Sequence, residues 1–106
     1  MSPVKLSSIE EIARQIVKGF HPQKIILFGS YAYGVPGVDS DVDLLITMNT
    51  NRRPLDEAVE IRKAIRFPFP VDLMVRTPQE FSKRLTMGDP FIREIQERGK
   101  VLYEAA

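Results

Sequence analysis

Helix-type and strand-type patterns of hydrophobic residues alternate along this chain. Apolar residues recur at helical spacing in four segments, at about residues 7–20, 54–66, 77–87 and 89–98. Between them lie short apolar runs rich in β-branched residues, at residues 24–28, 42–48, 71–75 and 100–104. This alternation predicts an α/β fold in which helices cover a small sheet.

Capping signals predict where the helices begin. Ser7 and Ser8 are each followed three residues later by a glutamate, so two overlapping capping boxes predict the start of the first helix. Pro54 suits the first turn of the next long helix, and Thr77 is a predicted N-cap. For the helix that begins at Pro54, the predicted inward face is Leu55, Ala58, Val59, Arg62 and either Ile61 or Ile65.

Length, charge and composition limit the organisation of the protein and its partners. A chain of 106 residues with 43% hydrophobic residues suits one domain over residues 1–106. The formal net charge of +1 argues against direct nucleic-acid binding, and the absence of cysteine excludes a disulfide framework and a thiolate zinc site. The apolar runs are far shorter than the ~18 residues that span a bilayer, and the N-terminus lacks a hydrophobic signal region. We therefore expect a cytoplasmic protein with no membrane contact.

Residues 29–40 form the longest irregular connection, and such segments often carry function. Gly29 and Ser30 directly follow a predicted buried strand. Glycine lets backbone N–H groups approach a ligand closely, and a short helix opening at Ser30 would present free N–H groups to a phosphate. The alternative is a plain tight turn. Tyr31 and Tyr33, which follow, would either stack on a base or pack against the sheet.

Three aspartates suggest a metal site. Asp41 and Asp43 are two residues apart on a predicted strand, so their carboxylates project from one face. Asp72 interrupts an otherwise apolar strand, and buried carboxylates are rarely left without a partner. If the strands of Asp43 and Asp72 are neighbours, three carboxylates converge and can hold Mg²⁺ or Mn²⁺ against a triphosphate. The alternative is that Asp41 belongs to a solvated turn that caps the strand.

These elements together resemble a known family. Gly29-Ser30, followed ten residues later by Asp41-Val42-Asp43 and then by a strand-borne Asp72, is similar to the motif of the DNA polymerase β-like nucleotidyltransferases. Within that superfamily the chain most resembles the minimal nucleotidyltransferases, small prokaryotic domains that stand alone. The resemblance covers nearly the whole chain and implies a mixed sheet flanked by helices.

The resemblance also implies roles for single residues. Gly29 and Ser30 would bind the phosphates of a nucleoside triphosphate, and Asp41, Asp43 and Asp72 would be catalytic and would bind two Mg²⁺ ions, or Mn²⁺. Asp72 would in addition help to activate the acceptor hydroxyl. All three aspartates are present, so the chain does not resemble an inactivated relative.

Members of this group resemble antitoxins that transfer AMP from ATP to a tyrosine of a helical HEPN-domain toxin. A protein partner of that kind is therefore expected, with an exposed apolar surface on one of the later helices. A homo-oligomer is left open. The sequence also leaves two other functions open: a non-catalytic antitoxin that neutralises its partner by occlusion, and, on weaker grounds, a metal-dependent phosphatase or nuclease.

Overall fold

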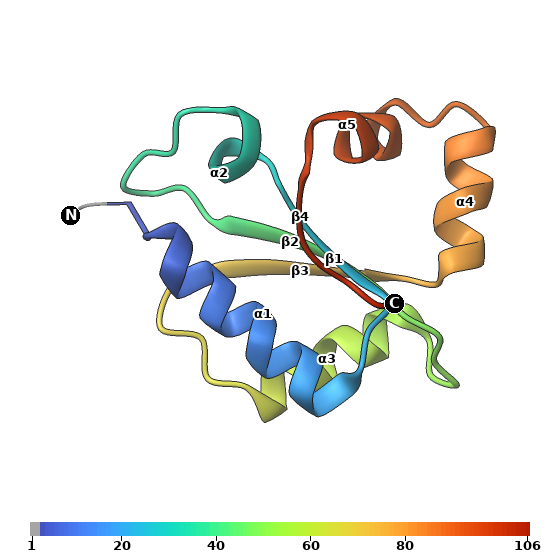
Figure 1. Cartoon of the computed structure of the whole chain (residues 1–106), viewed down its shortest axis with the longest axis horizontal. Helices are drawn as coiled ribbons and strands as arrows, with labels where there is room; N and C mark the ends of the chain where they lie inside the picture. Colours follow the sequence, from blue (N-terminus) through green and yellow to red (C-terminus); the bar gives the residue numbers. More distant parts are fainter. Residues whose placement is uncertain (1–2) are drawn as a thin grey trace.

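Helices and strands alternate through residues 3–106, the part of the chain that the computed structural model describes (Figure 1). In chain order they are α1 (Leu6–Phe20), β1 (Lys24–Phe28), α2 (Ser30–Tyr33), β2 (Val42–Thr47), α3 (Pro54–Ala64), β3 (Val71–Arg76), α4 (Pro78–Thr86), α5 (Pro90–Arg98) and β4 (Lys100–Glu104). The predicted strands are all present, and Ser30 opens a short helix as expected. No helix of residues 3–106 is long and apolar enough to cross a membrane.

The four strands form one mixed sheet in the order β3-β2-β1-β4. β1 pairs antiparallel with both β2 and β4, whereas β2 and β3 are parallel and α3 makes the crossover between them. β1 therefore ends where β2 and β3 begin. The predicted small mixed sheet with flanking helices is confirmed.

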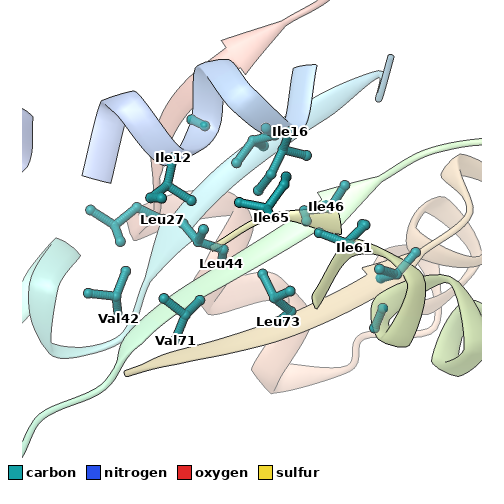
Figure 2. Close-up of a cluster of buried hydrophobic side chains, with 14 of the residues drawn as sticks. Ile12, Ile16, Leu27, Val42, Leu44, Ile46, Ile61, Ile65, Val71 and Leu73 are labelled. Carbon is teal, nitrogen blue, oxygen red and sulfur yellow. The ribbon is translucent and has the colours of Figure 1, made fainter. Parts of the chain in front are cut away.

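Helices cover both faces of the sheet. α1 and α3 pack on one face and α4 and α5 on the other, while α2 lies beyond the end at which β1 stops (Figure 1). Along β2, Val42, Leu44 and Ile46 point toward α1 and α3 (Figure 2), and Leu45 points toward α5. Burial on both faces explains why this strand is an almost continuous apolar run.

Two local predictions were wrong. The first helix begins at Leu6. Its N-cap residue is Lys5, whose side chain makes no capping hydrogen bond, so Ser7 and Ser8 lie inside the first turn instead of capping it. On α3, Leu55, Val59 and Arg62, all predicted to face inward, are exposed, whereas Ala58, Ile61 and, after the helix, Ile65 are buried against the sheet. The sequence pattern of this helix contains two apolar stripes, and only the neighbouring strands determine which one faces the core.

A buried carboxylate lies on the inward face of α3. Glu57 is 2% exposed and accepts hydrogen bonds from the Thr50 hydroxyl at 2.6 Å and from Arg52 Nη1 at 3.1 Å. A charge of this kind is stable inside a protein only when it is paired and hydrogen-bonded. Glu57 thus anchors the connection after β2 to the first turn of α3.

Candidate active site

A strained glycine turn joins β1 to α2. Gly29 has φ 71° and ψ −155°, a backbone conformation that is essentially restricted to glycine. A Cβ atom at this position would overlap Oδ2 of Asp43. The glycine therefore allows the Asp43 carboxylate to lie directly against the turn.

The first turn of α2 directly follows this glycine. The N–H groups of Ala32 and Tyr33 bond to the Gly29 carbonyl, and Gly34 N–H bonds to the Ser30 carbonyl. Within residues 3–106 no such bond uses the N–H groups of Ser30 and Tyr31. Unpaired N–H groups at the start of a helix suit an anionic ligand such as a phosphate.

Both tyrosines of α2 hold the helix in place, in agreement with the packing interpretation. The Tyr31 hydroxyl accepts a hydrogen bond from Val4 N–H at 3.0 Å, and its ring packs on the core. Arg98 of α5 lies over the Tyr33 ring at 4.7 Å from the centroid, and its Nη2 is 3.4 Å from the Tyr33 carbonyl. The contact with Arg98 joins residues 65 positions apart, and no local sequence signal indicates it.

Asp43 and Asp72 are direct neighbours in the sheet. In the parallel pairing of β2 with β3, Asp43 is opposite Asp72, and Phe28 is opposite Asp43 on the other side. Their carboxylates project from the same face, since alternating residues of both strands are buried under α1 and α3. The condition on which the three-aspartate prediction depends, adjacency of the two strands, is therefore met. Asp41 lies just before β2 rather than on it, and both Asp41 and Asp72 are exposed, so the expectation that Asp72 is a buried carboxylate is wrong.

The pKa of Asp43 is raised above its ordinary value. Burial is the largest cause, and the negative charges of Asp72 and of Asp41 add to it. A carboxylate in this setting is stabilised by any cation that binds beside it. The electrostatics of the site therefore favour a positively charged ligand between Asp43 and its acidic neighbours.

We expect the substitution Asp43→Asn to stabilise the ligand-free protein near neutral pH. Because the folded-state pKa is raised, the folded protein gains a proton more readily than the unfolded chain, and stability falls as pH rises above 3.8. Allowing for solvent screening, the gain is under about 1 kcal/mol, or a few degrees in Tm. Thermal unfolding at several pH values measures it. The advantage should vanish below the ordinary pKa of 3.8, where Asp43 itself is protonated; an advantage independent of pH would contradict this cause.

The donors at the site fit a hard metal ion, but the protein alone does not enclose one. Within residues 3–106, no three His, Cys, Asp or Glu side chains are grouped closely enough to hold a metal ion as they stand. Asp43 and Asp72 offer carboxylate oxygens, the ligands that Mg²⁺ prefers, and Mg²⁺ usually takes further ligands from water and substrate phosphates. The three-aspartate metal site remains a prediction.

A mixed sheet with a glycine-serine turn beside paired carboxylates is an arrangement suited to the transfer of phosphate-containing groups. Comparison with known proteins identifies which class of such enzymes this is. Residues 6–102 match the nucleotidyltransferase domain family, so the chain belongs to that family and is a nucleotidyltransferase.

Two similar proteins agree with this assignment. The chain is 31% identical over 83 residues to a protein of Methanocaldococcus jannaschii named putative protein adenylyltransferase, covering 76% of this chain and 78% of that protein. It also resembles the crystal structure of a putative nucleotidyltransferase from Sulfolobus solfataricus, with a TM-score of 0.59 and 25% identity over 74% of this chain and 71% of the other. The family resemblance expected from the sequence is confirmed.

Proposed function

We propose that this nucleotidyltransferase transfers AMP from ATP to a hydroxyl group of a protein partner. The observation that carries the proposal is the register pairing of Asp43 with Asp72 beside the Gly29 turn. The name of the archaeal relative, a putative protein adenylyltransferase, supports AMP as the transferred group and a protein as the acceptor.

Each residue of the site has a role in this proposal. Gly29 and Ser30 bind the triphosphate through backbone N–H groups at the start of α2. Asp41, Asp43 and Asp72 provide the carboxylates for Mg²⁺, with the exposed Asp41 side chain free to turn toward the other two. When bound, Mg²⁺ would neutralise the phosphates and the charge that develops on them. Most of the catalysis is then positioning and charge stabilisation.

The transfer step needs a group that accepts a proton. The acceptor oxygen attacks the α-phosphorus of ATP, a new O–P bond forms, and the bond between the α-phosphorus and the bridging oxygen breaks, so that pyrophosphate leaves. The hydroxyl proton passes to the carboxylate of Asp72, which is exposed and therefore within reach of an incoming acceptor, and then to solvent.

The acceptor in this proposal is a tyrosine of a HEPN-type helical protein, and modification of that tyrosine neutralises the partner as a toxin. Support comes from the family resemblance and from exposed apolar side chains on the later helices, Leu55 and Val59 on α3 and Phe91 on α5. An exposed apolar surface of this kind is typical of a protein interface.

Thermal unfolding with ATP, GTP, CTP or UTP, each with and without Mg²⁺, tests the nucleotide site. A ligand at ~100 times its Kd stabilises the folded state by ~2.7 kcal/mol, which is readily measured. We expect the largest shift with ATP, a requirement for Mg²⁺, and its loss in the double variant Asp41→Asn/Asp43→Asn. An equal shift in that variant would contradict the assigned carboxylates.

The mass of the partner after incubation separates catalysis from occlusion. Transfer predicts an added AMP on the partner that requires ATP and Asp72. Inhibition of the partner without any adduct would show that the protein acts as a binding module.

A further inference from the structure

β3 is an edge strand whose outer side is unpaired. It pairs only with β2, and the bonds Val42 N–H to Pro70 carbonyl and Met48 N–H to Arg76 carbonyl show that its even-numbered residues direct their backbone groups to β2. Backbone direction alternates along a strand, so the N–H and carbonyl groups of the odd-numbered residues point outward. Unpaired backbone groups at a sheet edge are a template for pairing with another chain.

Arginine side chains cover this edge at both ends but not at its centre. Arg62 Nη2 donates to the Val71 carbonyl at 2.6 Å, and Arg76 Nη1 donates to the Val75 carbonyl at 2.8 Å. Among residues 3–106 no side chain or loop hydrogen-bonds in the same way to Leu73, which lies between them with its side chain buried and its backbone groups on the outer side of the strand. The open part of the edge is therefore only a few residues long.

The open part of the edge adjoins both an apolar surface and the candidate active site. A groove of about 210 Å³ runs along it and is lined by Leu55, Ala58, Asp72, Leu73 and Met74 among others. Leu55 is 74% exposed, and Val59, one turn further along α3, is 43% exposed. One side of the edge is thus hydrophobic and the other carries the carboxylate of Asp72.

We propose that the acceptor protein docks at this groove as a short extended segment that adds a strand to β3 and pairs with Leu73. This inference rests on the proposed function, because it assigns the route by which a protein hydroxyl reaches Asp72. Side chains of the added strand would alternate between the two faces of the sheet. Apolar ones would contact Leu55 and Val59, and a hydroxyl-bearing one would lie on the face of Asp72.

Strand pairing would place that hydroxyl beside the Asp72 carboxylate. Side chains directly opposite each other on paired strands point to the same face, with Cβ atoms ~4.5–5.5 Å apart. A residue next to Asp72 on the added strand would therefore present its side chain beside the Asp72 carboxylate. Asp43, on the next strand, lies on the same face.

The charges at the ends of this edge favour a segment of another protein over a second copy of this chain. An antiparallel copy centred on Leu73 would bring Arg62 of one molecule against Arg76 of the other, and like charges placed opposite each other are destabilising. Within residues 3–106 no carboxylate pairs with Arg62, whose side chain is exposed. An acidic residue at that end of the segment would complement it.

Peptides of defined sequence test the proposal. The probe is a pool of acetylated and amidated nonapeptides of alternating Val and Thr, with Tyr, Ser or Thr at the centre and Asp or Glu at the ends. Transfer of AMP from Mg²⁺–ATP is read from peptide mass, and ATP binding is read from thermal unfolding. The edge variant is Leu55→Glu/Val59→Glu, in which both positions are exposed. The matched control, at exposed apolar positions elsewhere, is Met87→Glu/Val101→Glu.

We expect the edge variant to label peptides about tenfold more slowly than wild type, and the control to stay within about twofold of it. Thermal stabilisation by Mg²⁺–ATP should persist in both. In the most reactive peptide, N-methylation should abolish labelling only at alternate positions, because every second residue of an added strand bonds to β3.

Two results would overturn edge docking alone: equal labelling by the edge variant, or sensitivity to N-methylation without alternation. If Mg²⁺–ATP stabilises the wild type but no peptide is labelled, docking of a short segment at this edge is rejected, and the mass of the partner then decides whether AMP transfer to a protein fails as well. Absence of stabilisation by any nucleotide would instead reject the proposed function itself, and the docking inference with it.

Discussion

Replacing Asp72 by asparagine is expected to reduce AMP transfer by ~10²–10⁴-fold, the range typical of a lost general base. Asn keeps the size of the side chain but cannot accept the hydroxyl proton. Because Asp72 is exposed on the edge strand, the folded state loses no buried contact and Tm should not fall. Rates of peptide labelling with Mg²⁺–ATP measure the effect, and kcat should fall more than KM changes.

Asp56→Asn is the matched control for this substitution. Asp56 is an aspartate on α3 that pairs with Arg53 at the surface, and exposed ion pairs contribute little to stability. Labelling by this variant should equal that of wild type. A fully active Asp72→Asn enzyme would remove Asp72 from the proposed mechanism.

Gly29→Ala is expected to lower both stability and activity. Alanine at φ 71° and ψ −155° is strained by ~1–3 kcal/mol, which corresponds to a decrease in Tm of at least ~4 °C for a domain of this size. Its Cβ would in addition push the Asp43 carboxylate away from the turn. Thermal unfolding and peptide labelling measure the two losses.

Gly19→Ala provides a control of opposite sign. Gly19 lies in α1, and a Cβ there meets no atom within 4 Å, so alanine should stabilise the helix by ~0.5–1 kcal/mol.

The contact of residue 29 with Asp43 can be isolated by a double-mutant cycle of Gly29→Ala with Asp43→Ala. If the overlap contributes to the loss, the two substitutions will be less than additive. If the two losses of stability simply add, the loss in Gly29→Ala comes from backbone strain alone.

Much of the fold could be predicted from short stretches of sequence. β1 and β4 have the predicted limits, Lys24–Phe28 and Lys100–Glu104, and Thr77 caps α4 by accepting a hydrogen bond from Glu80 N–H at 3.1 Å. These features depend on hydrophobic period, turn residues and side chains within one turn of each other, all of which are local. The same local reasoning misplaced the start of α1, because a serine can occupy a first helical turn as well as cap it.

The order of helices and strands and the glycine turn could be predicted from the sequence, since each depends on neighbouring residues. The same holds for the positions of Asp41, Asp43 and Asp72 along the chain. The folded structure was needed to show that Asp43 is opposite Asp72, that the Asp43 carboxylate lies against Gly29, and that Leu55 and Val59 face outward beside the edge strand β3. Those relations depend on which strands pair and in what register. Pairing is decided by the total burial that separated segments achieve together, and no single stretch of sequence contains it.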